Sequence, residues 1–272
     1  MPTDPHAPRT FPLPNESPAR KEFVWRSSTR LDDRDQSALN VGAHQCSVLN
    51  TMACDTLDIS ADREDVRTQL KEWWGITNTT EARQTAGQLL DGMHSATYEV
   101  VFPLVSAIVD KTDGHNPEVH REYLALRAYS RGQSVDRWIS AYDALHQLRT
   151  VAQPFSGFTS PNWPTHIRAW DFGRLPYIVR VSRHIGYLDD DESWAILRAN
   201  LSAARSYYPN WRQFAQGVII GRTYWRALTD IATAGAYGQA AANAVNALLI
   251  RHDSPWRRLP LQDASVDQRV AR

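Results

Sequence analysis

Apolar residues recur every three or four positions through most of the chain from about residue 38 onward. Trp194, Leu197, Leu201 and Ala204 show this spacing, which places side chains on one face of an α-helix. No segment alternates apolar and polar residues for long enough to indicate a strand, and residues 178–181, which come nearest, lie within a stronger helical pattern. We therefore expect an all-α fold, an irregular bundle of roughly eight to ten helices.

Helix boundaries are predicted from polar residues before the apolar stripes and from glycines after them. A side-chain oxygen at the start accepts hydrogen bonds from unpaired backbone N–H groups, and a glycine at the end allows the left-handed backbone that stops a helix. Residues 39–54 are expected to be helical. A helix is predicted over residues 77–111, and Pro103 is expected to bend it or to mark the point where two helices meet. The predicted N-caps are Ser60, Asn116, Ser134, Thr165 and Asn210, and the predicted stops are Gly75 and Gly132.

Residues 1–35 lack this pattern and are rich in proline near their start. Proline removes a backbone donor, and few residues here could fill a core, so we interpret the segment as a disordered tail. The alternative is a short arm in which Phe11, Phe23, Val24 and Trp25 dock on the domain. Residues 36–272 are expected to form a single helical domain, with the turn-rich residues 151–164 as a possible subdomain boundary.

Composition narrows the classes of partner and compartment. The 30 basic and 30 acidic residues balance, which argues against binding nucleic acid or an anionic membrane through bulk charge. The chain has no apolar run of about 18 residues and no recognisable signal peptide at its start, so we expect a cytoplasmic protein that does not enter a membrane. Cys46 and Cys54 would lie about two turns apart on one helix, too far for a disulfide.

Most sequence motifs of known catalytic chemistry are missing. The chain has no phosphate-binding GxxxxGK[ST], no GxGxxG, no GxSxG, no HExxH and no CxxC pair. We therefore expect no metal and no cofactor. The acidic run at residues 189–192 could suggest a cation site, but we interpret it as the first turn of a helix, where the helix dipole favours negative charge.

The sequence AWDFGR at residues 169–174 places charged residues on the apolar stripe of a helix. Asp171 and Arg174 are three positions apart, and Trp170 lies one turn from Arg174. The other side of this helix is apolar too, which indicates a central position in the bundle. A charge in that position must be paired, because an unpaired buried charge costs several kcal/mol.

A second segment, residues 221–225, has a glycine on its apolar stripe and an arginine at the edge of that stripe. Glycine lets a neighbouring helix approach closely, so we infer that the two segments meet and that their opposite charges neutralise each other in the interior. The inferred cluster contains Asp171, Arg174 and Arg222, surrounded by Trp170, Trp211 and Trp225.

Two interpretations of this cluster remain. The one we favour from the sequence is structural, an ion-pair network that fixes the register of the helices. The other is a pocket in which the arginines bind an anionic group through paired hydrogen bonds. A catalytic Asp171 has less support, because a neighbouring arginine lowers the pKa of a carboxyl group and keeps it ionised. Arg222→Ala is expected to lower the melting temperature, and unchanged stability together with lost ligand binding would favour the pocket instead.

These segments together resemble the bacterial "domain of unknown function 1266" family. AWDFGR is followed by IGYLDDDESW at 185–194, a tryptophan at 211 and GRTYW at 221–225, with WWGI at 73–76 upstream and SPW at 254–256 downstream. The resemblance covers about residues 45–260, with its core at about 160–260, and implies no particular reaction, substrate or cofactor. The family positions matched here are Trp170, Asp171, Arg174, Gly186, Tyr187, Trp194, Gly221, Arg222 and Trp225.

The sequence as a whole favours a bacterial, non-enzymatic binding or adaptor module that recognises a protein or a small anionic ligand. The alternative is an enzyme, hydrolase- or transferase-like, that uses an Asp/Arg pocket. The candidate residues for a pocket or buried polar cluster are Trp170, Asp171, Arg174, Arg222, Trp225, Tyr187, Trp194 and Trp211.

Overall fold

The computed structural model describes residues 23–28, 30–46, 52–110, 116–150 and 163–262. Within these segments the chain is all-α, as predicted, with ten helices of seven or more residues and two of four residues. The only extended pairing in them is an isolated antiparallel bridge between Met52 and Ile59. No helix in the described segments is both long and apolar enough to cross a membrane.

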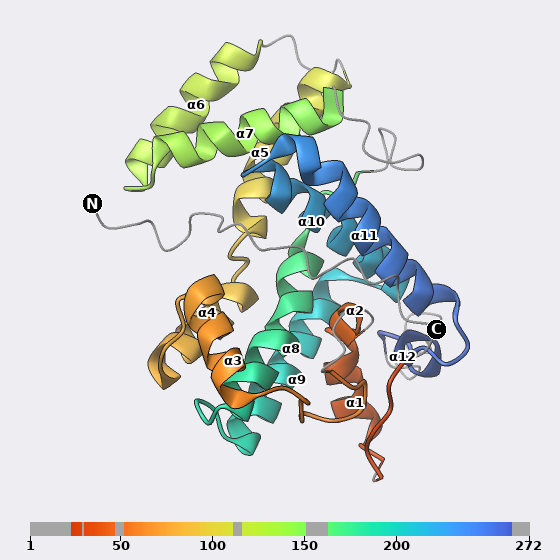
Figure 1. Ribbon diagram of the computed structural model, residues 1–272. Helices are drawn as coiled ribbons and strands as arrows, with labels where there is room; N and C mark the ends of the chain where they lie inside the picture. Colours follow the sequence, from red (N-terminus) through yellow and green to blue (C-terminus); the bar gives the residue numbers. More distant parts are fainter. Residues whose placement is uncertain (1–22, 29, 47–51, 111–115, 151–162, 263–272) are drawn as a thin grey trace, which may run out of the picture.

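The first half of the chain forms short helices and one helical hairpin (Figure 1). The hairpin is α6 and α7, which pack against each other, and α7 also packs on α5. The elements are α1 (Asp33–Asn40), α2 (Ala43–Cys46), α3 (Arg63–Gln69), the π-helical turn η1 (Leu70–Trp74), α4 (Thr79–Leu90), α5 (Ser95–Val109), α6 (Pro117–Ser130) and α7 (Val135–Thr150).

The second half contains four long helices. They are α8 (Arg168–His184), α9 (Asp190–Tyr207), α10 (Trp211–Ala227) and α11 (Ile231–Ile250), followed by the short α12 (Pro255–Arg258). Helix α8 lies in the middle of the molecule, in contact with α2, α4, α5, α9 and α10 (Figure 1). Thirteen of its 17 residues are buried, which agrees with the central position that its apolar faces predicted.

Most predicted helix boundaries are confirmed. Asn116 and Asn210 each accept a hydrogen bond from the third backbone N–H beyond them, and Ser134 accepts one from Arg137. Gly75 and Gly132 have positive φ angles directly after helices, as predicted. Asp189 caps α9, so the acidic run at residues 190–192 is its first turn.

Four boundary predictions are wrong. Asp62 rather than Ser60 caps α3, because its carboxylate accepts from the N–H groups of two first-turn residues. Helix α8 begins at Arg168, so Thr165 is not its cap. In the described part of the helix predicted over 39–54, α1 ends at Asn40 and α2 covers Ala43–Cys46, and Cys54 lies outside both. Pro103 lies inside α5, and the break between α4 and α5 falls at Gly92, whose φ is +89°.

Close contact between α8 and its neighbours depends on residues without side chains. A Cβ atom at Gly221 in α10 would overlap the Cβ of Trp170 in α8 and lie 3.0 Å from its Cγ. A Cβ atom at Gly173 would lie 2.5 Å from the imidazole of His44 in α2. Glycine at these two positions therefore lets α10 and α2 each approach α8 closely.

The apolar interior has two parts. The larger is built mainly from α1, α2, α4, α8, α9, α10 and α11, and the smaller mainly from α5, α6 and α7 with the last turns of α10. Residues 151–162, most of the predicted subdomain boundary, lie outside the described residues. Whether residues 36–272 form one domain therefore stays a prediction.

Residues 23–25 dock on the C-terminal part of the chain. Phe23 is buried, its backbone N–H donates to the Asp253 carboxylate at 3.4 Å, and the Arg251 guanidinium lies over its ring. The Arg258 guanidinium lies 3.5 Å from the ring centroid of Trp25. Residues 23–25 therefore dock as the short-arm alternative expected, while Phe11, with the rest of residues 1–22, lies outside the described residues.

Candidate functional site

The predicted pair of opposite charges lies in the first half of α8. Asp171 is completely buried and Arg174 is 4% exposed, and the Nη2 of Arg174 donates to an Asp171 oxygen at 3.2 Å. The two side chains meet because residues three apart share a face of one helix.

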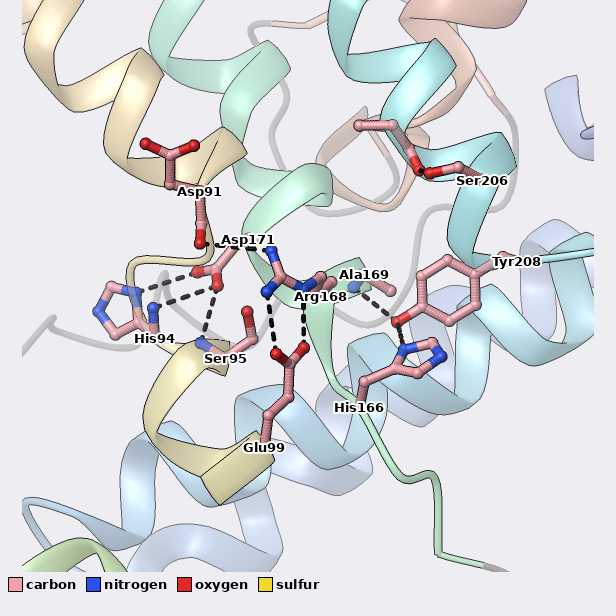
Figure 2. Close-up of polar contacts among 11 residues, drawn as sticks. Asp91, His94, Ser95, Glu99, His166, Arg168, Ala169, Asp171, Ser206 and Tyr208 are labelled. Carbon is pink, nitrogen blue, oxygen red and sulfur yellow. Dashed lines mark hydrogen bonds and ion pairs between the residues drawn. The ribbon is translucent and has the colours of Figure 1, made fainter. Parts of the chain in front are cut away.

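Asp171 also binds the start of α5 (Figure 2). One of its oxygens accepts hydrogen bonds from the backbone N–H groups of His94 and Ser95, at 3.1 and 2.9 Å. These are N–H groups that the helix itself leaves unpaired, and the positive end of the helix dipole favours a carboxylate there. Asp171 thus caps a helix that lies more than 70 residues away in sequence.

His94 lies between Asp171 and Arg174. Its Nδ1 is 2.6 Å from the Nη2 of Arg174 and 3.1 Å from the nearer Asp171 oxygen. A guanidinium nitrogen can only donate, so the 2.6 Å contact requires Nδ1 to be an unprotonated acceptor. Burial, reinforced by the charge of Arg174, lowers the pKa of His94 to about 4, which agrees with a neutral ring at neutral pH.

The electrostatics keep Asp171 ionised. Burial by itself raises the pKa of its carboxyl group, but the contact with His94, the charge of Arg174 and the Ser95 N–H lower it to about 2 overall. Because His94 is neutral at neutral pH, we assign most of the stabilisation of the Asp171 carboxylate at that pH to Arg174 and the backbone N–H groups. Asp171 is therefore an anion without a proton to donate at neutral pH.

Arg222 has no acidic partner. It lies on α10, and its Nε is buried without a hydrogen bond. Among the described residues no carboxylate is within ion-pair distance of it, and its guanidinium lies over the ring of Tyr237. Burial lowers its pKa. The predicted neutralisation of Arg222 by Asp171 is therefore wrong, since the Asp171 oxygens are occupied by Arg174 and the start of α5.

Arg222 nevertheless belongs to the same cluster. Burial lowers the pKa of Arg174 to about 10 against the opposing effect of Asp171, and the positive charge of Arg222 lowers it further. Burial lowers the pKa of His44 on α2 to about 3, and both arginines contribute to this shift. The two imidazoles are thus neutral, and the cluster combines one carboxylate with two guanidinium groups.

Aromatic rings cover the faces of these guanidiniums. The central carbon of Arg174 lies 4.8 Å from the ring centroid of Trp170 and 4.9 Å from that of Trp74. Trp225 extends this group, with its ring centroid 6.0 Å from that of Trp170. Stacking takes up the faces of the Arg174 guanidinium, so its hydrogen-bonding edges remain for other groups.

Three of the predicted site residues lie elsewhere. The ring centroid of Trp211 lies 4.7 Å from that of Trp256. Trp211 and Trp225 are 14 residues apart on α10, which separates them by about 21 Å along the helix axis at 1.5 Å per residue. Trp194 contacts Arg198 on α9, and Tyr187 follows α8, where it packs on the larger core. Trp211 was predicted to surround the arginines, and this is wrong.

Sequence reasoning also missed three residues of the cluster. His94 was hidden inside the long helix predicted over residues 77–111, and Gly92 was the signal that could have revealed its position at a helix start. His44 and Trp74 come from segments far from α8 in sequence, and nothing in their local pattern points to it.

A second polar group adjoins the first turn of α8 (Figure 2). Arg168 makes two hydrogen bonds to the Glu99 carboxylate, at 2.7 and 2.9 Å. The Tyr208 hydroxyl accepts from the Ala169 backbone N–H at 2.9 Å and contacts His166 at 3.1 Å. These contacts hold α8 against α5 and α9 and leave Arg168 neutralised.

The family model described as "Protein of unknown function (DUF1266)" matches residues 69–261, well over half of the chain. The chain belongs to this family. The matched region of this DUF1266 protein contains Trp74, His94, Asp171, Arg174 and Arg222, whereas His44 lies before it.

Two proteins of Escherichia coli (strain K12) are similar to this DUF1266 chain. The protein named "Uncharacterized protein YbeR" is 26% identical over 162 residues, which are 59% of this chain and 58% of YbeR. "Uncharacterized protein YbeU" is 26% identical over 207 residues, covering 73% of this chain and 77% of YbeU. The match therefore spans less than two thirds of YbeR. No solved structure matches the chain.

Proposed function

We propose that this protein is a binding module for a small anionic ligand, whose oxygens are held by Arg174 and Arg222. The observation that carries the proposal is the charge of the cluster, in which two guanidiniums accompany a single carboxylate that pairs with Arg174 and not with Arg222. Arginine is the residue best suited to hold carboxylate or phosphate oxygens, because its N–H groups form a rigid fork.

The surroundings of the two arginines support an anion as the missing partner. The charge of Arg222 is close enough to lower the pKa of Arg174, and two such like charges are unfavourable in an interior unless a further negative charge joins them. Both Arg174 and Arg222 keep a buried Nε that has no hydrogen bond. A bound oxyanion would supply both the charge and the acceptors that these groups lack.

Acid–base catalysis has less support than binding. Both oxygens of Asp171 already accept hydrogen bonds, and its pKa near 2 leaves it without a proton at neutral pH. His44 and His94, with pKa values of about 3 and 4, are neutral, but burial and the arginines make both of them weak bases.

The test is the melting temperature of the full chain at rising concentrations of inorganic phosphate, used as the simplest probe of the site. A ligand that binds only the folded state raises the melting temperature with the logarithm of its concentration. We expect this rise in the wild type and its loss in Arg222→Met, which keeps a long side chain but removes the charge. Without phosphate, Arg222→Met should melt no lower than the wild type, because burial disfavours the charged form of Arg222.

The matched control is Arg212→Met, which removes the same charge from an exposed position on the same helix. This variant should keep the full response to phosphate. The proposal fails if Arg222→Met and Arg212→Met respond to phosphate equally, or if sodium chloride at equal ionic strength produces the same rise in the wild type.

A further inference from the structure

The two cysteines lie together in the larger core, away from the arginine cluster. Cys46 ends α2 and Cys54 follows both short helices, and each is about 3% exposed. The Cys46 sulfur lies 3.4 Å from the carbonyl oxygen of Ala53, the residue before Cys54, so the two thiols are close enough to shift each other's pKa. Cys54 lies outside α2, so the two cysteines are not on one helix and the two-turn separation expected from the sequence does not apply.

A buried arginine without a carboxylate faces this pair. The Nη1 of Arg180, on α8, lies 3.6 Å from the sulfur of Cys46, and its Nη2 donates to the Asp58 carbonyl at 3.1 Å. Among the described residues no carboxylate is within ion-pair distance of Arg180, because the Asp58 side chain pairs with Arg183 instead. A buried guanidinium needs a negative charge near it, and the Cys46 sulfur is the group in position to carry one.

The same contacts decide which sulfur is ionised. The hydrogen bond from Cys54, together with the charge of Arg180, lowers the pKa of Cys46, against the opposing effects of burial and of Asp55. The pKa of Cys54 is raised, first by its hydrogen bond to Cys46 and then by burial. A protonated Cys46 would instead donate to the Ala53 carbonyl at 3.4 Å, which would leave Arg180 without a counter-charge.

We propose that Cys46 and Cys54 form an oxidisable dithiol site, with Cys46 as the nucleophile and Cys54 as the resolving thiol. The oxidant class is a small peroxide, and hydrogen peroxide is its simplest member. The sulfur pair lies just beneath the surface, since Asp55 is partly exposed and Asp58 is exposed. A molecule of this size therefore has a short path to it.

The reaction proceeds in two balanced steps. The Cys46 thiolate attacks one peroxide oxygen, the O–O bond breaks, and the departing hydroxide takes up a proton to leave as water, giving a sulfenic acid at Cys46. The Cys54 sulfur, losing its proton as it attacks, then forms the S–S bond and expels the hydroxyl group as a second water. Two thiols and one peroxide thus become one disulfide and two waters.

The experiment exploits the fact that the chain has only these two cysteines. The folded full chain is treated with hydrogen peroxide at pH 7, then denatured in N-ethylmaleimide, and its intact mass is measured. We expect both thiols to be lost together from the monomer, with the mass of two hydrogens, and dithiothreitol to restore them. Retention of both thiols, at peroxide concentrations that oxidise the urea-unfolded chain, would overturn the proposal.

Variants separate the two roles. Cys54→Ser should stop at the sulfenic acid, which dimedone labels, whereas Cys46→Ser should leave Cys54 largely unreacted. Arg180→Gln should slow the reaction of Cys46 about tenfold or more at pH 7, because a cysteine of ordinary pKa is only a few per cent thiolate there, and Arg180→Lys should restore part of the rate. Equal reactivity of Cys46→Ser and Cys54→Ser would contradict the assignment.

A second measurement covers the case in which Arg180→Gln does not fold. The alkylation rate of Cys46 in the wild type is followed against pH by peptide mapping. The charged groups that face its sulfur are Arg180 and Asp55, and Cys54 is the titratable neighbour. We expect the rate to rise with an inflection clearly below the ordinary cysteine pKa of about 8.5, and an inflection at or above that value would refute the thiolate.

Discussion

Asp171 is the residue on which the polar interior depends most directly. Its carboxylate accepts hydrogen bonds from Arg174 and from the first backbone N–H groups of α5, and it is completely buried. One side chain therefore neutralises a buried arginine and completes the start of a distant helix. Both roles need a negative charge as well as acceptor atoms.

Replacing Asp171 by asparagine should lower the free energy of unfolding at pH 7 by about 3–5 kcal/mol, the usual cost of breaking a buried ion pair. Asparagine also replaces one of the two acceptor oxygens by an NH₂ group. This group cannot accept a hydrogen bond from Arg174 or from the backbone N–H groups of α5. Chemical denaturation followed by circular dichroism measures the change. A loss below about 1 kcal/mol would show that Asp171 contributes no more than an exposed pair.

The same variant should also flatten the acid limb of the stability curve. The folded pKa of Asp171 is about 2 against an ordinary 3.8, so its contribution is complete above 3.8 and is lost as pH falls toward 2. The difference in stability between the wild type and Asp171→Asn should therefore shrink over that range. A difference that stays constant from pH 7 to pH 2 would contradict the assigned charge.

At the scale of elements, the contact between α8 and α10 sets the geometry of the arginine cluster. Gly221 lets the Trp170 side chain lie directly on the α10 backbone, and Arg222 follows Gly221 in sequence. Gly217, one turn earlier, is close in the same way to Ala169 and to the Tyr208 hydroxyl. Two glycines four residues apart thus form the surface of α10 against which α8 packs.

Alanine substitution at two helical glycines should change stability in opposite directions. At Gly221 the added Cβ overlaps Trp170, so we expect a loss of about 1–3 kcal/mol from overpacking. At Gly87 in α4 the added Cβ has no neighbour within 4 Å, so we expect a gain of about 0.5–1 kcal/mol from restricting the unfolded chain. Thermal denaturation compares them, and equal shifts in the two variants would contradict this account of the α8–α10 contact.

At the scale of the whole molecule, α8 and α10 lie deep in the structure and the α6–α7 hairpin lies at one end (Figure 1). Most residues of α8 and α10 are buried. Helix α6 buries only three residues and exposes several large apolar ones: Val119, Tyr123, Leu126 and Tyr129. The hairpin therefore has fewer contacts that must break before its amides meet water.

Amide hydrogen exchange should follow this arrangement. We expect α8 and α10 to exchange only by global unfolding, and α6 to exchange through a lower-energy local opening. Exchange measured by mass spectrometry at several denaturant concentrations tests this, because local opening responds weakly to denaturant. If α6 and α8 exchange with the same free energy, the molecule opens as a single unit instead.

The sequence alone determined the features that depend on neighbours along the chain. The spacing of apolar residues predicted the all-α class and the buried central helix, and caps such as Asn116 and Asn210 marked helix starts. The pairing of Asp171 with Arg174 was predictable for the same reason, since three residues along a helix fix the distance between them.

Tertiary packing decided everything that joins distant segments. The crossing of α8 and α10 placed Arg222 near Arg174 but left it without a carboxylate, and the start of α5 occupied an Asp171 oxygen. Trp211 stacks on Trp256 at the other end of α10, and Cys54 lies near Cys46 although the two are not on one helix. Periodicity reports which face of a helix is buried, whereas the neighbour that buries it depends on how all the helices pack together.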